Sequence, residues 1–277
     1  MLENQAETSA RAARFAALHR PGDPLVLPNP WDVGTARILA ALGFQALATT
    51  SAGMAFSMGR RDGAAGREAA LAHAAQLVAA TDLPVSADLE NGFGDRPEDA
   101  AETIRRAGAI GLAGASIEDA SGDPDAPIYD RSLAVERVAA AVEAARGLGR
   151  PFVLTARAEN FLHGRPDLDD TLARLAAFEA AGADVLYAPG LSRIEDIRAV
   201  CRGVSRPVNV LGGGALSVAE LAEAGAARVS LGGALARAAL GAFLRAAREV
   251  RKSGTFGFAA EAAGFAEIQG FMQGRPD

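Results

Sequence analysis

Cysteine is almost absent from this sequence, because Cys201 is the only one among 277 residues. A single cysteine excludes an internal disulfide and is typical of a reducing compartment. Apolar runs long enough to span a bilayer are also absent, and the N-terminus lacks the basic and apolar segments of a secretory signal. The net charge of −6 leaves no basic excess for binding nucleic-acid phosphates. We therefore expect a cytoplasmic protein that binds neither membranes nor nucleic acids.

Hydrophobic residues, in contrast, make up 49% of the chain, against 22% charged residues. This balance allows a large buried core and argues against disorder. The length is typical of a (β/α)8 barrel with small additions, and no linker-like segment divides the chain. We expect residues 1–277 to form a single domain.

Two sequence units recur along the chain. In the first, a helix end closed by glycine, which tolerates left-handed backbone angles, is followed at once by a short apolar strand. In the second, proline comes directly before a strand, where its missing N–H is tolerated. The two units alternate strictly and predict eight strands, at 25–29, 46–50, 85–90, 112–118, 152–157, 185–188, 208–211 and 228–231.

Helical segments lie between the predicted strands, for example at 67–80 and 132–147. Strict alternation of strands and helices requires a parallel sheet with right-handed crossovers. Eight such units predict an α/β fold of the (β/α)8 TIM barrel type, with an open doubly wound sheet as the alternative. We expect residues 1–20 to form an amphipathic helix that plugs the bottom of the barrel. The aromatic tail 253–277 is predicted to be an arm that packs in an oligomer.

Carboxylates gather at the predicted strand ends, where the active sites of this fold lie. Asp88 and Glu90 point to one face because they are two residues apart on one strand, and Glu118 ends the neighbouring strand. Two such charges about 5 Å apart repel by roughly 3 kcal/mol at an effective dielectric of about 20. Three carboxylates placed together stay partly protonated, form ion pairs with arginine, or recruit a cation. Oxygen ligands without a His/Cys cluster favour Mg²⁺ or Mn²⁺ over zinc.

Arg157 is the cation at a predicted strand end near the middle of the site. Its guanidinium can hold a substrate carboxylate through two parallel hydrogen bonds. The alternative is a core salt bridge to Glu118 or Glu159. The segment 50–53 (TSAG) offers hydroxyl and backbone N–H groups as a cradle for a carboxylate or oxyanion.

Two glycine clusters support a rival interpretation. Residues 212–214 and 232–233 follow the last two predicted strands, where (β/α)8 enzymes often bind a phosphate. On this interpretation the substrate is a phosphorylated sugar or heterocycle. Against it, the only lysine, Lys252, lies outside the strand ends and provides no Schiff base there.

Taken together, the motifs of this chain resemble the isocitrate lyase/phosphoenolpyruvate mutase superfamily. The resemblance covers residues 29–214, and its strongest part is the D-x-E of 88–90 followed by the I-E-D of 117–119. The motifs that carry it are 29–32 (NPWD), 50–54 (TSAGM), 62–63 (DG), 86–95 (SADLENGFGD), 116–127 (SIEDASGDPDAP), 155–161 (TARAENF) and 208–214 (VNVLGGG).

The resemblance implies a Mg²⁺-dependent enzyme that acts on 2-oxo acids or their precursors through a pyruvate-like enolate, whose charge a divalent ion stabilises. It implies that Asp88 touches the metal, with the metal's waters held by Asp62, Glu90 and Glu118. Substrate-binding roles are implied for Trp31, Ser51, Ala52, Gly53, Asp88, Arg157 and Asn209. The resemblance also implies a last barrel helix exchanged between the subunits of a dimer or tetramer.

The sequence departs from the family on the loop after the fourth predicted strand. Isocitrate and methylisocitrate lyases carry a Lys-Lys/Arg-Cys-Gly-His motif there, whereas residues 119–130 (DASGDPDAPIYD) contain no Cys, His or Lys. Cys201 is predicted on a distant helix and cannot replace the missing acid. Tyr129 is a candidate substitute, and with Arg157 and Glu118 it makes up the predicted catalytic residues.

Three functions are consistent with these residues. The first is a carbon–carbon lyase or decarboxylase for a small 2-oxo or 2-hydroxy di- or tricarboxylate, like 2-methylisocitrate lyase or oxaloacetate decarboxylase. The second is phosphorus–carbon chemistry, as in a phosphonopyruvate hydrolase or a phosphoenolpyruvate mutase. The third is a 2-oxo acid binding protein without activity, which the missing loop motif supports.

Overall fold

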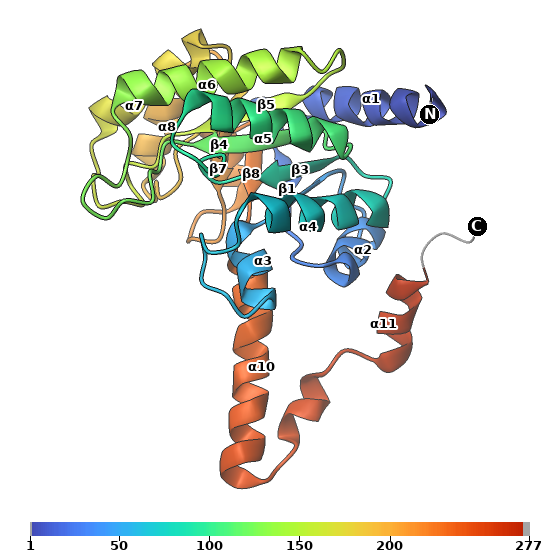
Figure 1. Cartoon of the computed structure of the whole chain (residues 1–277). Helices are drawn as coiled ribbons and strands as arrows, with labels where there is room; N and C mark the ends of the chain where they lie inside the picture. Colours follow the sequence, from blue (N-terminus) through green and yellow to red (C-terminus); the bar gives the residue numbers. More distant parts are fainter. Residues whose placement is uncertain (1, 274–277) are drawn as a thin grey trace.

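Eight parallel strands form one sheet that curves into a nearly closed barrel in the computed structural model, which describes residues 2–273 (Figure 1). The strand order is β1-β8-β7-β6-β5-β4-β3-β2, and a backbone hydrogen bond of 3.0 Å from Ala48 N–H to the Pro28 carbonyl joins β2 to the end of β1. The strands are β1 (Leu25–Leu27), β2 (Leu47–Ala48), β3 (Val85–Asp88), β4 (Gly114–Glu118), β5 (Val153–Arg157), β6 (Val185–Tyr187), β7 (Val208–Leu211) and β8 (Arg228–Ser230). Each lies inside one predicted range, so the predicted TIM barrel is confirmed.

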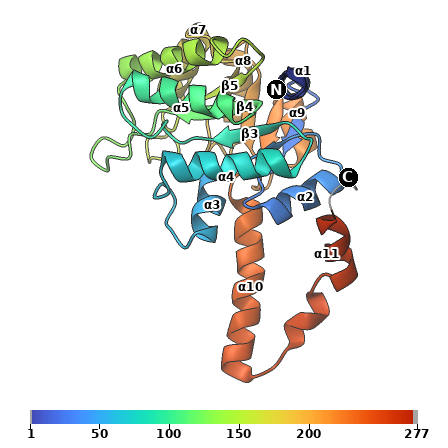
Figure 2. The same cartoon turned by 45° about the vertical axis from the view of Figure 1, so that its right-hand side comes forward.

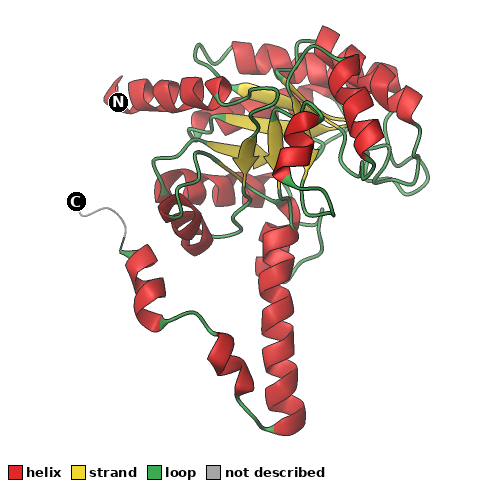
Figure 3. Ribbon diagram, turned by 180° about the vertical axis from the view of Figure 1, so that it is seen from behind, coloured by secondary structure: helices red, strands yellow, loops and turns green. Residues whose placement is uncertain are grey.

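Helices enclose the strands on the outside (Figure 3). They are α2 (Val33–Ala41), α3 (Ser51–Ser57), α4 (Arg67–Ala80), α5 (Pro97–Ala109), α6 (Arg131–Arg146), α7 (Leu168–Ala180), α8 (Ile194–Gly203) and α9 (Val218–Glu223). Local sequence sets where they begin: the Asp32 carboxylate, for example, caps α2 by accepting the Thr35 N–H at 2.7 Å. None of the helices within residues 2–273 has both the length and the apolar composition needed to cross a membrane.

The N-terminal helix α1 (Leu2–Ala17) closes the bottom of the barrel, as predicted. Its Phe15 side chain is fully buried and packs with Leu25 and Val153, which begin β1 and β5. Gly114 at the start of β4 leaves room for this contact, because an added Cβ would lie 3.0 Å from the Phe15 ring. The helix ends at Ala17, before the predicted residue 20.

The last barrel helix, α10 (Ala234–Ser253), projects away from the barrel in Figure 1 and Figure 2. The chain then returns through η1 (Gly257–Glu261) to α11 (Phe265–Met272), which lies against α2. The segment that leaves the barrel therefore begins with α10, earlier than the predicted arm 253–277. Residues 274–277 of that arm lie outside the described part of the chain.

Large apolar side chains on this projecting segment face solvent. Phe243 and Phe256 are each 67% exposed, and Phe265 is 82% exposed. Side chains of this size are normally buried, and fully burying one stabilises a protein by roughly 1.5–3 kcal/mol. The segment therefore has the composition of a packing surface, and its packing in an oligomer stays a prediction.

Candidate active site

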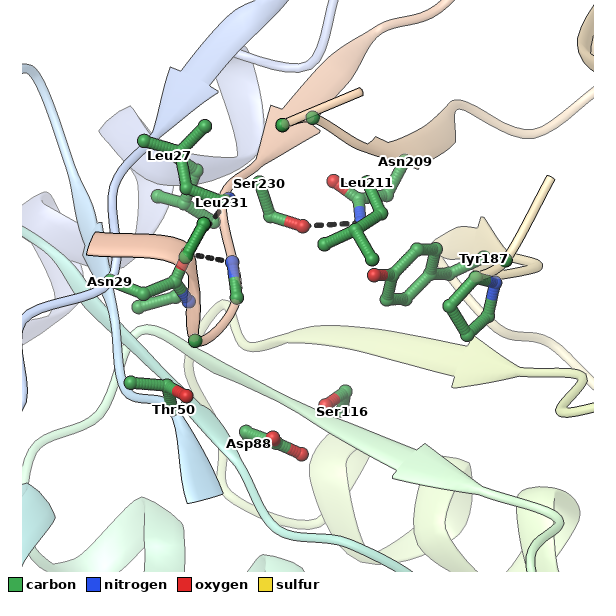
Figure 4. A pocket seen from close by; sticks show the side chains of 18 of the residues that line it. Leu27, Asn29, Thr50, Asp88, Ser116, Tyr187, Asn209, Leu211, Ser230 and Leu231 are labelled. Carbon is green, nitrogen blue, oxygen red and sulfur yellow. Dashed lines mark hydrogen bonds between the residues drawn. The ribbon is translucent and has the colours of Figure 1, made fainter. Parts of the chain in front are cut away.

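A cavity of about 520 Å³ opens at the C-terminal ends of the strands. All eight strands contribute side chains to its wall, and the loops after β2, β6, β7 and β8 form its rim. Figure 4 shows Asp88 and Ser116 on one side of this cavity and Tyr187, Asn209 and Ser230 on the other. The cavity therefore lies where the predicted site residues were expected to meet.

Arg157, the last residue of β5, is bonded to three carboxylates. Its Nη1 lies 2.9 Å from Asp88 Oδ1, its Nη2 lies 3.0 Å from Glu118 Oε2, and its Nε lies 2.8 Å from Glu159 Oε1. Strand pairing brings Glu118 beside Arg157, because the two residues are in register on β4 and β5. All three guanidinium nitrogens are therefore engaged, and the core salt bridge considered from the sequence is present.

The carboxylates around Arg157 outnumber it. Glu90, two residues beyond Asp88, has a left-handed backbone with φ of 50°. Burial raises the pKa of Glu90 to about 7, and the nearby charges of Asp88 and Asp62 add to this effect. Burial also raises the pKa of Glu118 well above its ordinary value, although the charge of Arg157 opposes it. The site thus holds more carboxyl groups than cations, and the raised pKa values mean that some of these groups keep a proton unless a further cation binds.

Within residues 2–273, no group of three or more His, Cys, Asp or Glu side chains stands ready as a set of metal ligands. Asp88 and Glu118 are each bonded to Arg157 instead. Mg²⁺ nevertheless needs few protein ligands, because it keeps several waters and is usually bound through one or two carboxylates. Asp88 and Asp62 both line the cavity, so the donors present fit a largely hydrated ion of this kind.

The structure brings most of the predicted substrate-binding residues to the cavity wall, namely Ser51, Ala52, Asp88, Arg157 and Asn209. Gly53 and Trp31 lie behind the wall instead. A Cβ on Gly53 would lie 2.6 Å from Thr50 Cγ2 and 2.9 Å from Trp31 Cβ, so Gly53 and Trp31 pack together beside the first turn of α3, which carries Ser51. Their contribution to the site is through packing, and Glu90 and Glu118 likewise adjoin the wall without being part of it.

Tyr129, the predicted substitute acid, is turned away from the cavity wall. Its hydroxyl donates to Asp95 Oδ1 at 2.7 Å and accepts from Asn91 Nδ2 at 3.0 Å, and the Arg137 guanidinium lies 4.5 Å from its ring centre. Burial and the hydrogen bond to Asp95 raise the pKa of Tyr129 to about 12. In this arrangement Tyr129 anchors the segment 119–130, and nothing in its position supports a role as an acid.

Tyr187, Arg228 and Ser230 are among the residues of the cavity wall that sequence reasoning missed. They form a network with Asn209, which accepts from Arg228 Nε and donates to Ser230 Oγ, each at 2.9 Å. Ser230 in turn hydrogen-bonds Tyr187, whose ring lies 5.3 Å from the Arg157 guanidinium carbon. The signal was present in the segment 228–231, because Arg228 and Ser230 are two apart and so face the same side.

Residues 15–251 match the family model described as phosphoenolpyruvate phosphomutase. A crystal structure from Burkholderia cenocepacia J2315, whose name leaves the choice between lyase and mutase open, is 59% identical, covers 98% of both chains and has a TM-score of 0.94. An uncharacterised protein of Mycobacterium tuberculosis H37Rv is 36% identical over 85% of this chain and 88% of its own length. The structure of oxaloacetate acetylhydrolase with the product oxalate is 25% identical, covers 95% of this chain and 94% of its own, and has a TM-score of 0.85.

Other homologues are named 2-methylisocitrate lyase, oxaloacetate decarboxylase and 2,3-dimethylmalate lyase. These homologues and structural neighbours are enzymes, so the comparisons favour an enzyme over the binding protein without activity. The matched residues include both the carboxylate cluster and the cavity wall. The chain therefore belongs to the phosphoenolpyruvate phosphomutase family and is a lyase-type enzyme of the isocitrate lyase/phosphoenolpyruvate mutase superfamily.

Proposed function

We propose that the chain is a Mg²⁺-dependent lyase or decarboxylase for a small 2-oxo or 2-hydroxy di- or tricarboxylate, acting through an enolate-like intermediate. The observation that carries this proposal is the group of carboxylates around one guanidinium at the strand ends. A dipositive ion offsets the negative charge of these carboxylates, and carboxylate oxygens are ligands that Mg²⁺ prefers. Members of the superfamily generally use a divalent metal.

Asp88 is the residue proposed to hold the ion directly, with Asp62, Glu90 and Glu118 bound to its waters. When bound, the ion stabilises the negative charge that develops on the substrate's oxo oxygen, an effect worth several kcal/mol. Arg157 keeps Asp88 and Glu118 in place through its bonds to both. These carboxylates are then organised before substrate arrives, so little reorganisation is needed during the reaction.

The substrate's reacting end is proposed to lie at the start of α3. Ser51 and Ala52 line the cavity there and offer the Ser51 hydroxyl and the Ala52 backbone N–H to a carboxylate. The Ser51 N–H already contacts Asp88 Oδ2 at 3.3 Å, which places the cradle beside the proposed metal ligand. Leu162 and Leu191 also line the cavity, on the loops after β5 and β6, and offer apolar contacts to the bound substrate.

The test is the release of pyruvate, coupled to lactate dehydrogenase, with and without Mg²⁺. Oxaloacetate, 2-methylisocitrate and phosphonopyruvate serve as substrates because each can yield pyruvate. We expect release from one of the first two that depends on Mg²⁺ and falls at least about 100-fold in Asp88→Asn. Asp169→Asn makes the same chemical change on the exposed surface of α7 and should leave the rate unchanged. Full activity of Asp88→Asn without metal would overturn the proposal.

A second candidate function is phosphorus–carbon bond chemistry on phosphonopyruvate. It is favoured by the glycines 212–214 and 232–233, which line the cavity at the end of α10 nearest the strands, together with Arg237 in the first turn of that helix. Backbone N–H groups at a helix N-terminus are suited to a phosphoryl group. Phosphorus NMR distinguishes the two functions, because only phosphorus–carbon chemistry forms free phosphate or a new phosphoester from phosphonopyruvate.

A further inference from the structure

The cavity reaches from the ends of the strands down to their beginnings. Arg157 is the last residue of β5, whereas Arg228 is the first residue of β8, and both line the cavity. Strand register connects them directly, because Arg157 pairs with Tyr187, Tyr187 with Asn209, and Asn209 with Arg228. A polar stripe therefore runs down the barrel wall from the carboxylate cluster to the floor.

The lower part of this barrel is unusually polar. TIM barrel interiors are mostly filled by layers of Val, Ile and Leu. Here the wall below the strand ends carries Ser86, Ser116, Asn209 and Arg228 instead. Within residues 2–273 the hydroxyls of Ser86 and Ser116 have no hydrogen-bond partner, so they are available to a ligand or to water.

Arg228 is a buried cation whose charge is not neutralised. Arg228 is only 4% exposed. Its guanidinium forms hydrogen bonds with Asn209 Oδ1 (2.9 Å), Thr155 Oγ1 (3.0 Å) and His19 Nε2 (3.2 Å). Burial and the Arg228 charge lower the pKa of His19 to about 3, so all three partners are neutral at physiological pH. No Asp or Glu of the described chain forms an ion pair with Arg228.

A buried charge without a counter-ion is costly, and proteins normally pair it. Arg157 illustrates the usual solution, because three carboxylates share its guanidinium. A guanidinium has five N–H groups, and the three bonds of Arg228 leave two of them without an acceptor among the described residues. Arg157 keeps two N–H groups by the same count, but three carboxylates already match its charge. Of the two buried arginines on the described wall, Arg228 at the floor is therefore the cation that an entering carboxylate can neutralise, whereas Arg237 at the rim is exposed to solvent.

We propose that Arg228 binds the second carboxylate of the substrate at the cavity floor, and so selects dicarboxylates over monocarboxylates of pyruvate size. This inference rests on the proposed function, in which the first carboxylate lies at Ser51 and Ala52 beside Asp88. The substrate then lies along the barrel axis with one anionic group at each end. Ser86 and Ser116 line the path between the two ends and can hydrogen-bond a polar group on the substrate.

The experiment is isothermal titration calorimetry in the presence of Mg²⁺, with malonate, succinate and glutarate as dicarboxylate probes and pyruvate as the monocarboxylate. We expect the wild-type protein to bind at least one dicarboxylate more tightly than pyruvate. Arg228→Gln should weaken the binding of that dicarboxylate roughly 10- to 100-fold, since a hydrogen bond to a charged group contributes about 1.5–3 kcal/mol. Pyruvate affinity should change by less than about twofold. Arg228→Lys, which keeps the charge, should recover part of the loss.

A second variant tests the same inference without removing the buried arginine. Asn209→Asp places a permanent carboxylate at the atom that already accepts from Arg228 Nε at 2.9 Å. The internal ion pair should raise the midpoint of thermal unfolding and also weaken dicarboxylate binding, because the cation is then neutralised from within. Because Asn209 lines the cavity itself, pyruvate is measured alongside as the reference. A floor site for the second carboxylate predicts a loss confined to the dicarboxylate, whereas a merely structural Arg228 predicts stabilisation without that selective loss. Arg206→Gln, at an exposed arginine before β7, is the matched control and should change neither.

The inference would be overturned if Arg228→Gln weakened the binding of pyruvate and of the dicarboxylate equally, or weakened the binding of neither. The same holds if wild-type protein binds no dicarboxylate better than pyruvate. Failure of the proposed function is a separate result, namely no Mg²⁺-dependent pyruvate release from any substrate. If that occurred while Arg228→Gln still lost its dicarboxylate preference, the floor site would stand without the proposed reaction.

Discussion

At the scale of single residues, two buried arginines in one cavity differ in their neighbours. Burial lowers the pKa of Arg157, but Glu118, Glu159 and Asp88 outweigh it and hold that pKa well above its ordinary value. Burial lowers the pKa of Arg228 to about 10, with Arg157 adding to the decrease. Both guanidiniums stay charged near neutral pH. Arg157 organises three of the protein's own carboxylates, whereas Arg228 pairs with none among residues 2–273.

Removing the charge of Arg157 should therefore destabilise the protein. We expect Arg157→Met to lower the free energy of unfolding by about 3–5 kcal/mol, because Asp88, Glu118 and Glu159 lose the partner that compensates their burial. Urea unfolding followed by circular dichroism measures this change. Added Mg²⁺ should restore more stability to Arg157→Met than to the wild type, because the ion supplies positive charge at the same place. Equal effects of Mg²⁺ on the two proteins would contradict this account.

His19 predicts how stability depends on pH. Its Nδ1 lies 2.9 Å from the Phe15 carbonyl and its Nε2 lies 3.2 Å from Arg228 Nη1, and its pKa falls from 6.5 to about 3 in the fold. Between these two values the unfolded chain binds a proton that the folded protein does not. Stability from this group is therefore complete above pH 6.5 and is lost as the pH falls toward 3, by roughly 1.4 kcal/mol per pH unit.

The measurement is urea unfolding of wild type and His19→Gln at pH 7.5, 6.0 and 5.0. Glutamine keeps an acceptor for Arg228 but does not titrate, so the variant should lose less stability than the wild type between pH 6.0 and 5.0. Equal losses of unfolding free energy in both proteins would show that other groups, such as the strand-end carboxylates, govern the decrease in stability at acidic pH.

At the scale of elements, α10 is the part whose environment is incomplete within one chain. Leu240, Phe243 and Leu244 are 41%, 67% and 47% exposed, and their i, i+3, i+4 spacing places them on one face of the helix. A contiguous apolar face of this kind marks an interaction surface. We expect it to pack against a second copy of the chain, in a dimer or tetramer.

Phe243→Glu should shift the protein to smaller species, because a charge replaces the most exposed apolar side chain of that face. Sedimentation velocity reports the assembly directly. Ala242→Glu adds the same charge about 100° away around the helix, outside the apolar face, and should leave the assembly unchanged. A wild-type protein that sediments as a monomer would refute the expected exchange of the C-terminal helix.

At the scale of the whole molecule, the barrel gathers negative charge at one end of its axis and leaves a positive charge near the other. Asp88 and Glu118 stand at the C-terminal ends of β3 and β4, while Arg228 begins β8. This polarity suits a metal ion at the mouth and an anionic group at the floor. A cytoplasmic location is consistent with one cysteine in the sequence and stays a prediction.

Metal binding at the mouth should stabilise the entire fold, because the ion binds the native protein and not the unfolded chain. At a Mg²⁺ concentration about 100 times its dissociation constant, we expect a gain of about 2.7 kcal/mol in the free energy of unfolding. Differential scanning fluorimetry with and without EDTA measures the shift in midpoint. Asp88→Asn should show little shift, and a shift as large as that of the wild type would place the metal elsewhere.

The sequence by itself determined the barrel and much of the site. Glycine-closed helix ends and prolines before strands marked all eight strands, because both devices act on the local backbone. The two-residue period of a strand placed Asp88 and Glu90 near one another, and motifs located Ser51, Arg157 and Asn209. These inferences depend only on residues that are close in the chain, and the structure agrees with where they place the strands and the mouth of the cavity.

Only the tertiary structure decided which partners these side chains take. Asp88 and Arg157 are separated by 69 residues, and their bond depends on how β3 and β5 are placed around the barrel. The same holds for Tyr129, which turns to Asp95, 34 residues away, and not to the cavity. Arg228 reaches Thr155 and His19 across the barrel interior and pairs with no carboxylate in the part of the chain that the structure describes. Local patterns cannot specify such contacts, because they arise from closure of the sheet, which brings distant strands around one small space.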